Sequence, residues 1–193
     1  MILKLNSVLR GLYVGRFQPF HLGHLEAVKW ILGKVDEIII AVGSSQYSHS
    51  LKNPFTAGER ITMIIKALEW AGIDRRKFLT IPVPDIHTHS LWVEHVVSLV
   101  PSFRAVFTNE PLTKRLFEED GRFEVSPIPF FKRELYSATE IRRRIVLGDN
   151  WEELVPKPVA EYIKEIKAVE RIRALASTDK LESKRRSQVS IPL

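Results

Sequence analysis

The chain has 193 residues, of which 45% are hydrophobic and 27% charged, a composition typical of one globular domain. Its longest apolar run, residues 38–43, is far shorter than the roughly 18 residues of a membrane span, and the lack of cysteine excludes disulfides and thiolate metal sites. The N-terminus shows no secretion signal, so the sequence predicts a cytoplasmic protein without a membrane partner.

The formal net charge of +6 lies mostly near the C-terminus. Residues 171–193 carry six basic and two acidic side chains, so the remaining residues have a net charge of only +2. Basic, serine-containing ends of this kind are more often solvated than bound to nucleic acid. We therefore expect a domain at residues 1–176, a flexible basic tail at 177–193 and no nucleic-acid partner.

Hydrophobic periodicity switches repeatedly between strand-like runs and helical spacing. This alternation predicts an α/β fold with a doubly wound, mostly parallel sheet of five strands and additional helices at the C-terminal end. The predicted strands are 11–14, 36–42, 77–83, 103–108 and 123–128. The predicted helices are 25–32, 56–70, 90–100, 111–119, 137–147 and 159–176.

A polar block joins the first strand to the first helix, where α/β proteins bind phosphates. Gly15 lets the chain leave the strand tightly, and Gly23 is expected to let the histidines approach a ligand. His21 and His24 lie on one face of the helix start, near free backbone N–H groups. They form a donor cluster suited to phosphate oxygens, although an isolated pair would more often be a simple helix cap.

The second strand is followed by a polar loop at residues 43–55, in which Lys52 is placed to reach a phosphate. Thr56 and Glu59 have the spacing of a capping box, which predicts the start of the next helix. Gly72 ends that helix.

The third strand leads into the segment Asp85–Trp92, at the sheet edge where a second substrate is expected. Asp85, His87 and His89 also permit a metal-site interpretation, but no fourth ligand is in sight. Trp92 has helical spacing to Val96 and Leu99, so a core position is the alternative to ligand contact.

A second phosphate-type block, residues 136–144, begins a later helix. Ser137 is an N-cap candidate, Thr139 lies in the first turn and Arg142 lies one turn later. Taken alone, this block is better explained by a capping box followed by a solvated arginine face than by a phosphate site.

The first block, Gly-Arg-Phe-Gln-Pro-Phe-His-x-Gly-His, resembles the opening block of archaeal-type nicotinamide mononucleotide adenylyltransferases, members of the His-x-Gly-His nucleotidyltransferase superfamily. In that superfamily, Ser-x-Thr-x-x-Arg binds the outer phosphates of ATP, and Ser137, Thr139 and Arg142 match it position for position. The resemblance covers about residues 10–173, with both blocks in the family's order and at its usual separation.

The resemblance implies that the phosphate of nicotinamide mononucleotide attacks the α-phosphorus of ATP and displaces pyrophosphate, without a covalent enzyme intermediate. Mg²⁺ would be bound mainly through the substrate phosphates, and a homo-oligomer is implied, with a hexamer as one form. The implied catalytic residues are His21, His24, Arg16 and Arg142. The implied ATP-binding residues are Gly15, Arg16, Phe17, Gln18, His21, His24, Thr108, Asn109, Ser137, Thr139 and Arg142.

The acceptor side of the resemblance consists of Trp92, Lys52 and Asp85. Trp92 would stack on the cationic nicotinamide ring. The family often has arginine where this chain has Lys52, which leaves a point charge instead of a bidentate contact.

Two alternatives remain open at this point. The superfamily also accommodates other acceptors, including pantetheine phosphate and flavin mononucleotide, and cytidylyl transfer. A non-catalytic nucleotide or nucleic-acid binder would instead use the basic tail and bind with steep salt dependence.

Overall fold

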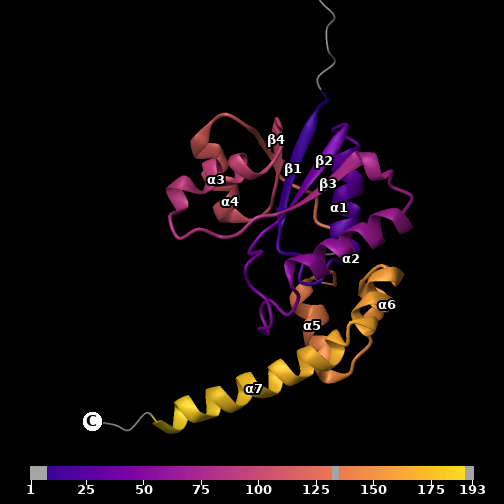
Figure 1. Cartoon of the computed structure of the whole chain (residues 1–193), viewed down its shortest axis with the longest axis vertical. Helices are drawn as coiled ribbons and strands as arrows, with labels where there is room; N and C mark the ends of the chain where they lie inside the picture. Colours follow the sequence, from indigo (N-terminus) through magenta and orange to yellow (C-terminus); the bar gives the residue numbers. More distant parts are fainter. Residues whose placement is uncertain (1–7, 132–134, 190–193) are drawn as a thin grey trace, which may run out of the picture.

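The computed structural model of the chain describes residues 8–131 and 135–189, with side chains described as far as residue 178 (Figure 1). Its centre is a sheet of five parallel strands in the order β3-β2-β1-β4-β5. The strands are β1 (Arg10–Gly15), β2 (Glu37–Val42), β3 (Phe78–Pro82), β4 (Ala105–Phe107) and β5 (Glu124–Ser126). The predicted doubly wound, parallel fold is confirmed.

The central strands are buried on both faces, so their sequences are continuous apolar runs. In β2, Ile38 and Ile40 belong to one core, while Ile39 and Ala41 belong to the other. Helices α1 (Leu22–Leu32) and α2 (Ala57–Trp70) cover the first face, and α3 (Trp92–Leu99) and α4 (Pro111–Asp120) cover the second. The sheet is therefore the middle layer of three.

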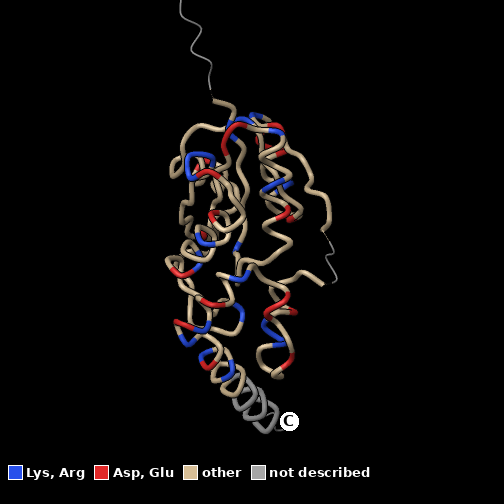
Figure 2. Tube along the Cα trace, turned by 90° about the vertical axis from the view of Figure 1, so that its right-hand side faces the viewer, with Lys and Arg blue, Asp and Glu red and all other residues tan. Residues whose placement is uncertain are grey.

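Local signals account for most helix ends. The Thr56 side chain accepts a hydrogen bond from the Glu59 N–H and the Glu59 carboxylate accepts one from the Thr56 N–H, which is the predicted capping box. Gly121 ends α4 and Gly148 ends α5 (Ala138–Leu147), both with left-handed backbone that favours glycine. On α4, Lys114 pairs with Glu118 and Arg115 with Glu119. Basic and acidic residues are intermingled along the chain in the same way (Figure 2).

The prediction of one final helix at 159–176 is wrong. The segment forms two helices, α6 (Lys157–Glu165) and α7 (Ala168–Val189), separated by Lys167 with φ of 53°. Apolar spacing continues across the break, so periodicity alone did not reveal it. Helix α6 packs on α2 and α7 packs on α5, and α7 extends beyond the predicted domain boundary at residue 176.

The order of the strands determines where a ligand can sit. The chain winds outward from β1 to β3 and then returns across the sheet to β4, on the other side of β1. Loops after β1 and β4 consequently diverge at the carboxyl edge, which is the usual ligand position in such sheets. Of the helices in the described residues, none is long and apolar enough to cross a membrane.

Candidate active site

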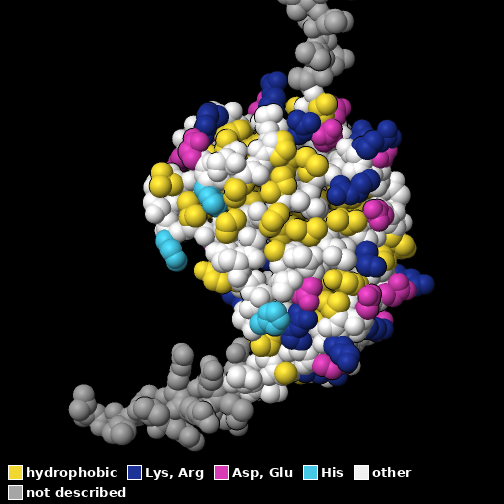
Figure 3. All heavy atoms as spheres, in the orientation of Figure 1, with side chains coloured by type: hydrophobic (Ala, Val, Ile, Leu, Met, Phe, Trp, Pro, Cys, Tyr) yellow, Lys and Arg dark blue, Asp and Glu magenta, His cyan; other side chains and the backbone are white. Residues whose placement is uncertain are grey.

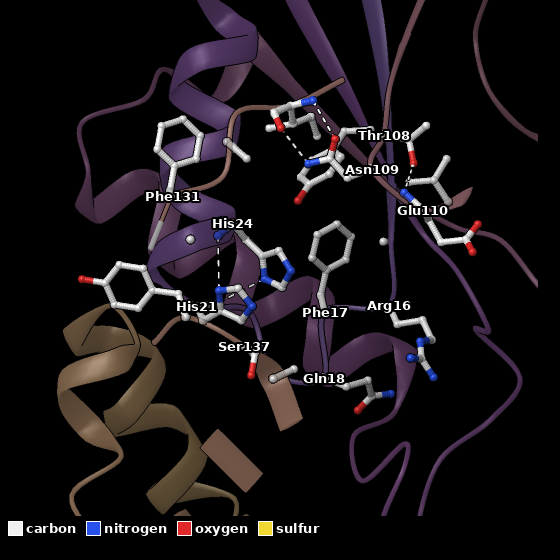
Figure 4. A pocket seen from close by; sticks show the side chains of 18 of the residues that line it. Arg16, Phe17, Gln18, His21, His24, Thr108, Asn109, Glu110, Phe131 and Ser137 are labelled. Carbon is white, nitrogen blue, oxygen red and sulfur yellow. Dashed lines mark hydrogen bonds between the residues drawn. The ribbon is translucent and has the colours of Figure 1, made fainter. Parts of the chain in front are cut away.

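A cavity of about 440 Å³ lies at this switch point, between the ends of β1 and β4 and the first turn of α5 (Figure 4). Most of the predicted site residues line it together, although they are more than 120 positions apart in the sequence. The predicted residues in its wall are Gly15, Arg16, Phe17, Gln18, His21, His24, Lys52, Thr108, Asn109, Ser137, Thr139 and Arg142.

The two histidines cap α1 reciprocally. His21 is the N-cap, and its Nδ1 accepts a hydrogen bond from the His24 N–H at 3.3 Å, while His24 Nδ1 accepts one from the His21 N–H at 3.3 Å. Their rings stack with centroids 3.5 Å apart. The helix-cap interpretation is therefore correct, and α1 begins three residues earlier than predicted.

The cap also sets the chemistry of both rings. A neutral imidazole whose Nδ1 accepts a hydrogen bond carries its proton on Nε2. Burial lowers the pKa of His21 to about 3, and burial together with the neighbouring His21 lowers the pKa of His24 well below 6.5. At neutral pH the pair is uncharged, and each ring has an Nε2–H to donate.

Aromatic rings hold His24 in place. The Phe17 ring meets it edge-on at 4.9 Å and the Phe20 ring lies at 5.4 Å. Phe17 has a φ of 51°, and a Cβ on Gly15 would lie 2.6 Å from its ring, so Gly15 is required for this turn.

Gly23 lines the cavity, and it also permits a close contact between two elements. A Cβ at this position would lie 3.0 Å from Tyr136 Cβ and 3.2 Å from the His21 ring. The glycine therefore allows α1 to approach the segment that begins α5, and this contact joins the two sequence blocks.

Two arginines add positive charge to the cavity. Arg142 donates to the Gln18 carbonyl at 2.7 Å and to Thr139 Oγ1 at 3.3 Å. Burial, assisted by nearby Arg16, lowers the pKa of Arg142 to about 10, which still leaves it charged at neutral pH. The Arg16 side chain is exposed and forms part of the cavity wall.

Polar side chains brace the loops around the cavity. Gln18 forms two hydrogen bonds with the backbone of Phe55, both at 3.0 Å, and Asn109 forms two with the backbone of Ile128, at 2.6 and 3.0 Å. Both residues are predicted to bind ATP, Asn109 largely through its backbone, and in the structure their amide groups hold neighbouring loops. Thr108 and Ser137 likewise accept from the backbone N–H groups of Glu110 and Glu140.

The remaining predicted acceptor residues lie away from the described cavity wall. Asp85 Oδ1 accepts a hydrogen bond from the Ser44 N–H at 3.2 Å, which links the loops after β3 and β2. Trp92 begins α3 and meets Phe117 edge-on at 5.7 Å, and it is partly buried against the core on the second face. No group of three or more His, Cys, Asp or Glu side chains in the described residues could hold a metal ion, so the metal-site interpretation of Asp85, His87 and His89 is unsupported.

Sequence reasoning missed Arg60 as a site-supporting residue. It is fully buried and donates to the carbonyls of Thr56, Arg16, Gly43 and Ser44. In the sequence Arg60 reads as an ordinary helix position, because its partners become neighbours only after the sheet forms.

Residues 12–144 match the cytidylyltransferase-like family. The chain is 52% identical to the nicotinamide-nucleotide adenylyltransferase of Pyrococcus horikoshii over 186 residues, which are 96% of this chain and 99% of that relative. It is 54% identical to the enzyme of the same name from Saccharolobus solfataricus, across 89% of this chain and 99% of the relative. A third, from Ignicoccus hospitalis, is 56% identical across 89% and 100%.

A similar architecture occurs in a solved structure from Francisella tularensis, described as a bifunctional NMN adenylyltransferase/ADP ribose pyrophosphatase. The TM-score is 0.73 at 22% identity, and the match covers 96% of this chain and 58% of that one. A second structure of the same name was determined with AMP and a manganese ion, with a TM-score of 0.72 at 22% identity over 96% and 57% of the two chains.

Proposed function

Because the chain belongs to the cytidylyltransferase-like family and, within it, to the nicotinamide-nucleotide adenylyltransferases, we propose that its cavity joins ATP and nicotinamide mononucleotide. An oxygen of the mononucleotide phosphate attacks the α-phosphorus of ATP. The bond from that phosphorus to the bridging oxygen of the β-phosphate breaks, which releases pyrophosphate and leaves NAD.

The reciprocal histidine cap is the observation that carries this proposal. Two neutral rings, whose Nε2–H groups have no hydrogen-bond partner among the described residues, lie beside the N-terminus of α1, where the helix dipole also favours anions. His21 and His24 would donate to the triphosphate oxygens, which become more negative as pyrophosphate leaves. Such fixed donors stabilise a transition state because they need no reorganisation.

The arginines complete the proposed triphosphate site. Arg16 and Arg142 would hold flanking oxygens. Ser137, the N-cap of α5, and Thr139, in its first turn, line the cavity and would bind the outer phosphates. Catalysis would then consist of positioning and charge stabilisation, as in other phosphoryl and nucleotidyl transfers.

Mg²⁺ would arrive with the nucleotide. Apart from Glu110, the charged side chains of the cavity wall are arginine and lysine, which suit phosphate oxygens better than a bare cation. When bound, the ion would supply positive charge that neutralises the phosphates.

On the acceptor side, Lys52 would contact the mononucleotide phosphate as a point charge, with Asp85 and Trp92 beside the nicotinamide nucleoside. A cationic ring favours an indole face. Trp92→Ala would then raise KM for nicotinamide mononucleotide and leave KM for ATP nearly unchanged. An equal effect on both constants would instead support a core role for Trp92.

We also propose a homo-oligomer, with a hexamer as one form. On the face shown in Figure 3, hydrophobic side chains gather at the centre and charged ones along the margin. Light scattering behind size-exclusion chromatography would give a multiple of the 22.2 kDa chain mass, and a mass of one chain would reject the oligomer.

The decisive experiment is product identification by mass. The protein is incubated with ATP, Mg²⁺ and, separately, nicotinamide mononucleotide, nicotinate mononucleotide, pantetheine phosphate or flavin mononucleotide, with CTP replacing ATP in parallel. We expect NAD and pyrophosphate from ATP and nicotinamide mononucleotide. Without NAD in that reaction, the proposed function fails.

A further inference from the structure

Arg60 joins the ends of two central strands beneath the cavity. Its Nη1 donates to the Arg16 carbonyl at 2.9 Å and to the Gly43 carbonyl at 2.8 Å, so it holds the segments that leave β1 and β2. Nη2 reaches the Ser44 carbonyl at 3.2 Å, and Nε reaches the Thr56 carbonyl at 3.2 Å. One guanidinium therefore fixes three separate pieces of backbone.

Burying this positive charge costs free energy, so stability alone does not explain an arginine at this position. Arg60 is 0% exposed, and among the described residues it has no carboxylate within ion-pair distance. Replacing a buried ion by an apolar side chain of similar volume is often neutral or stabilising. Burial lowers the pKa of Arg60 to about 10, with Asp85 opposing and Arg16 adding to the effect, so the group stays charged at neutral pH.

The segments that Arg60 holds include a residue with a strained backbone and a residue whose side chain lines the cavity. Ser44 has a φ of 50°, a left-handed conformation that costs free energy for a residue other than glycine. Its N–H is held by Asp85 and its carbonyl by Arg60. Arg60 holds only the main chain of Arg16, through its carbonyl. The Arg16 guanidinium has no hydrogen-bond partner among the described residues, and Arg16 lies in the cavity wall.

We propose that Arg60 is a positioning residue for the transfer reaction, which acts by fixing the main chain of Arg16 so that the Arg16 guanidinium meets the substrate phosphate. This inference rests on the proposed function and adds a residue that does not itself touch the substrates. The competing interpretation is that Arg60 only stabilises the fold.

A double-mutant cycle in kcat/KM separates the two interpretations. Arg60→Lys keeps the charge but cannot reach four carbonyls with one nitrogen. If Arg60 acts through Arg16, Arg60→Lys lowers kcat/KM roughly tenfold in the otherwise unchanged enzyme but less than about twofold in Arg16→Ala, because contacting residues are not additive. Equal factors in both backgrounds would overturn the proposal.

The control is Arg75→Lys. Arg75 also donates to a backbone carbonyl, that of Phe78 at 2.8 Å, but at the opposite end of β3. We expect it to change kcat/KM less than about twofold in either background. A comparable loss in Arg75→Lys would show that any arginine–carbonyl bond gives this effect, and would also overturn the proposal.

If Arg60→Lys does not fold, the same cycle is run with Arg60→Met, which fills a similar volume without charge. If neither variant gives folded protein by circular dichroism, Arg60 is a folding residue and the positioning role is rejected. Failure of the unchanged enzyme to make NAD refutes the proposed function, whereas equal factors in an active enzyme refute only the role of Arg60.

Discussion

At the scale of single residues, the chemistry of the site depends on two uncharged histidines. His24→Ala removes one Nε2–H donor from the triphosphate, so we expect turnover to fall about 10²–10³-fold, the usual effect of losing one charge-stabilising donor. Steady-state kinetics would measure it, with folding checked by circular dichroism. Lys29→Ala, on the exposed side of the same helix, is the control and should remain within about twofold.

The same rings predict a pH dependence of stability. The pKa of His21 is lowered from 6.5 to about 3 by burial, and that of His24 is lowered as well. Below pH 6.5 these two histidines bind protons in the unfolded chain but stay neutral in the folded chain. The unfolding free energy therefore falls as the pH drops from about 6.5 toward 3.

NMR of ¹⁵N-labelled histidine provides the direct measurement. In the absence of substrates, His21 and His24 should remain as the Nε2–H tautomer between pH 8 and pH 5. If either ring becomes protonated near pH 6.5, the neutral-donor assignment is wrong.

At the scale of elements, the contact between α1 and α5 depends on Gly23. Gly23→Ala places a Cβ 3.0 Å from Tyr136 Cβ, so we expect a loss of about 1–3 kcal/mol in unfolding free energy and a clear fall in turnover. Gly58→Ala, in the first turn of α2, has nothing within 4 Å of the new Cβ. It should stabilise the protein by about 0.4–1 kcal/mol, as measured by urea unfolding.

A partly buried ion pair joins α7 to α2, in addition to the packing of α7 on α5. Arg171 binds both carboxylate oxygens of Glu59 at 2.8 Å and the Pro54 carbonyl at 3.1 Å, next to the Lys52 loop. Arg171→Met should lower the unfolding free energy by about 1–3 kcal/mol because a charged partner is left unpaired. Arg115→Met, which breaks an exposed pair with Glu119, should cost at most about 0.5 kcal/mol.

Elements with local signals could be predicted from the sequence. Thr56 and Ser137 cap their helices as expected, and the apolar run of β2 is a central strand. The break at Lys167 could not be predicted, because a lysine in the left-handed region leaves no sequence signal.

In the site, too, features with a local sequence signal could be predicted, and features that depend on tertiary structure could not. The clustering of His21, His24, Ser137 and Arg142 followed from position and resemblance. The hydrogen bonds from Gln18 to Phe55 and between Asn109 and Ile128 could not be predicted, because only the tertiary structure brings these partners together.

At the scale of the whole molecule, substrate binding should appear as stability. A ligand that binds only the folded state adds about 2.7 kcal/mol at 100 times its Kd, which for a chain of this size corresponds to a rise in Tm of about 5–10 °C. We expect this rise with ATP and Mg²⁺ in differential scanning fluorimetry. In Arg142→Ala the rise should be much smaller at the same concentrations, and an unchanged rise would remove Arg142 from the ATP site.

The reciprocal cap of His21 and His24 has an evolutionary consequence. The two rings stack with their centroids 3.5 Å apart, so a substitution at one position removes one donor and also the ring against which the second donor packs. The two positions are therefore epistatic: after the first change, the second costs little, because groups that act as a unit are strongly non-additive. A descendant that lost either histidine would be free to lose both, and its cavity could then drift toward binding without catalysis.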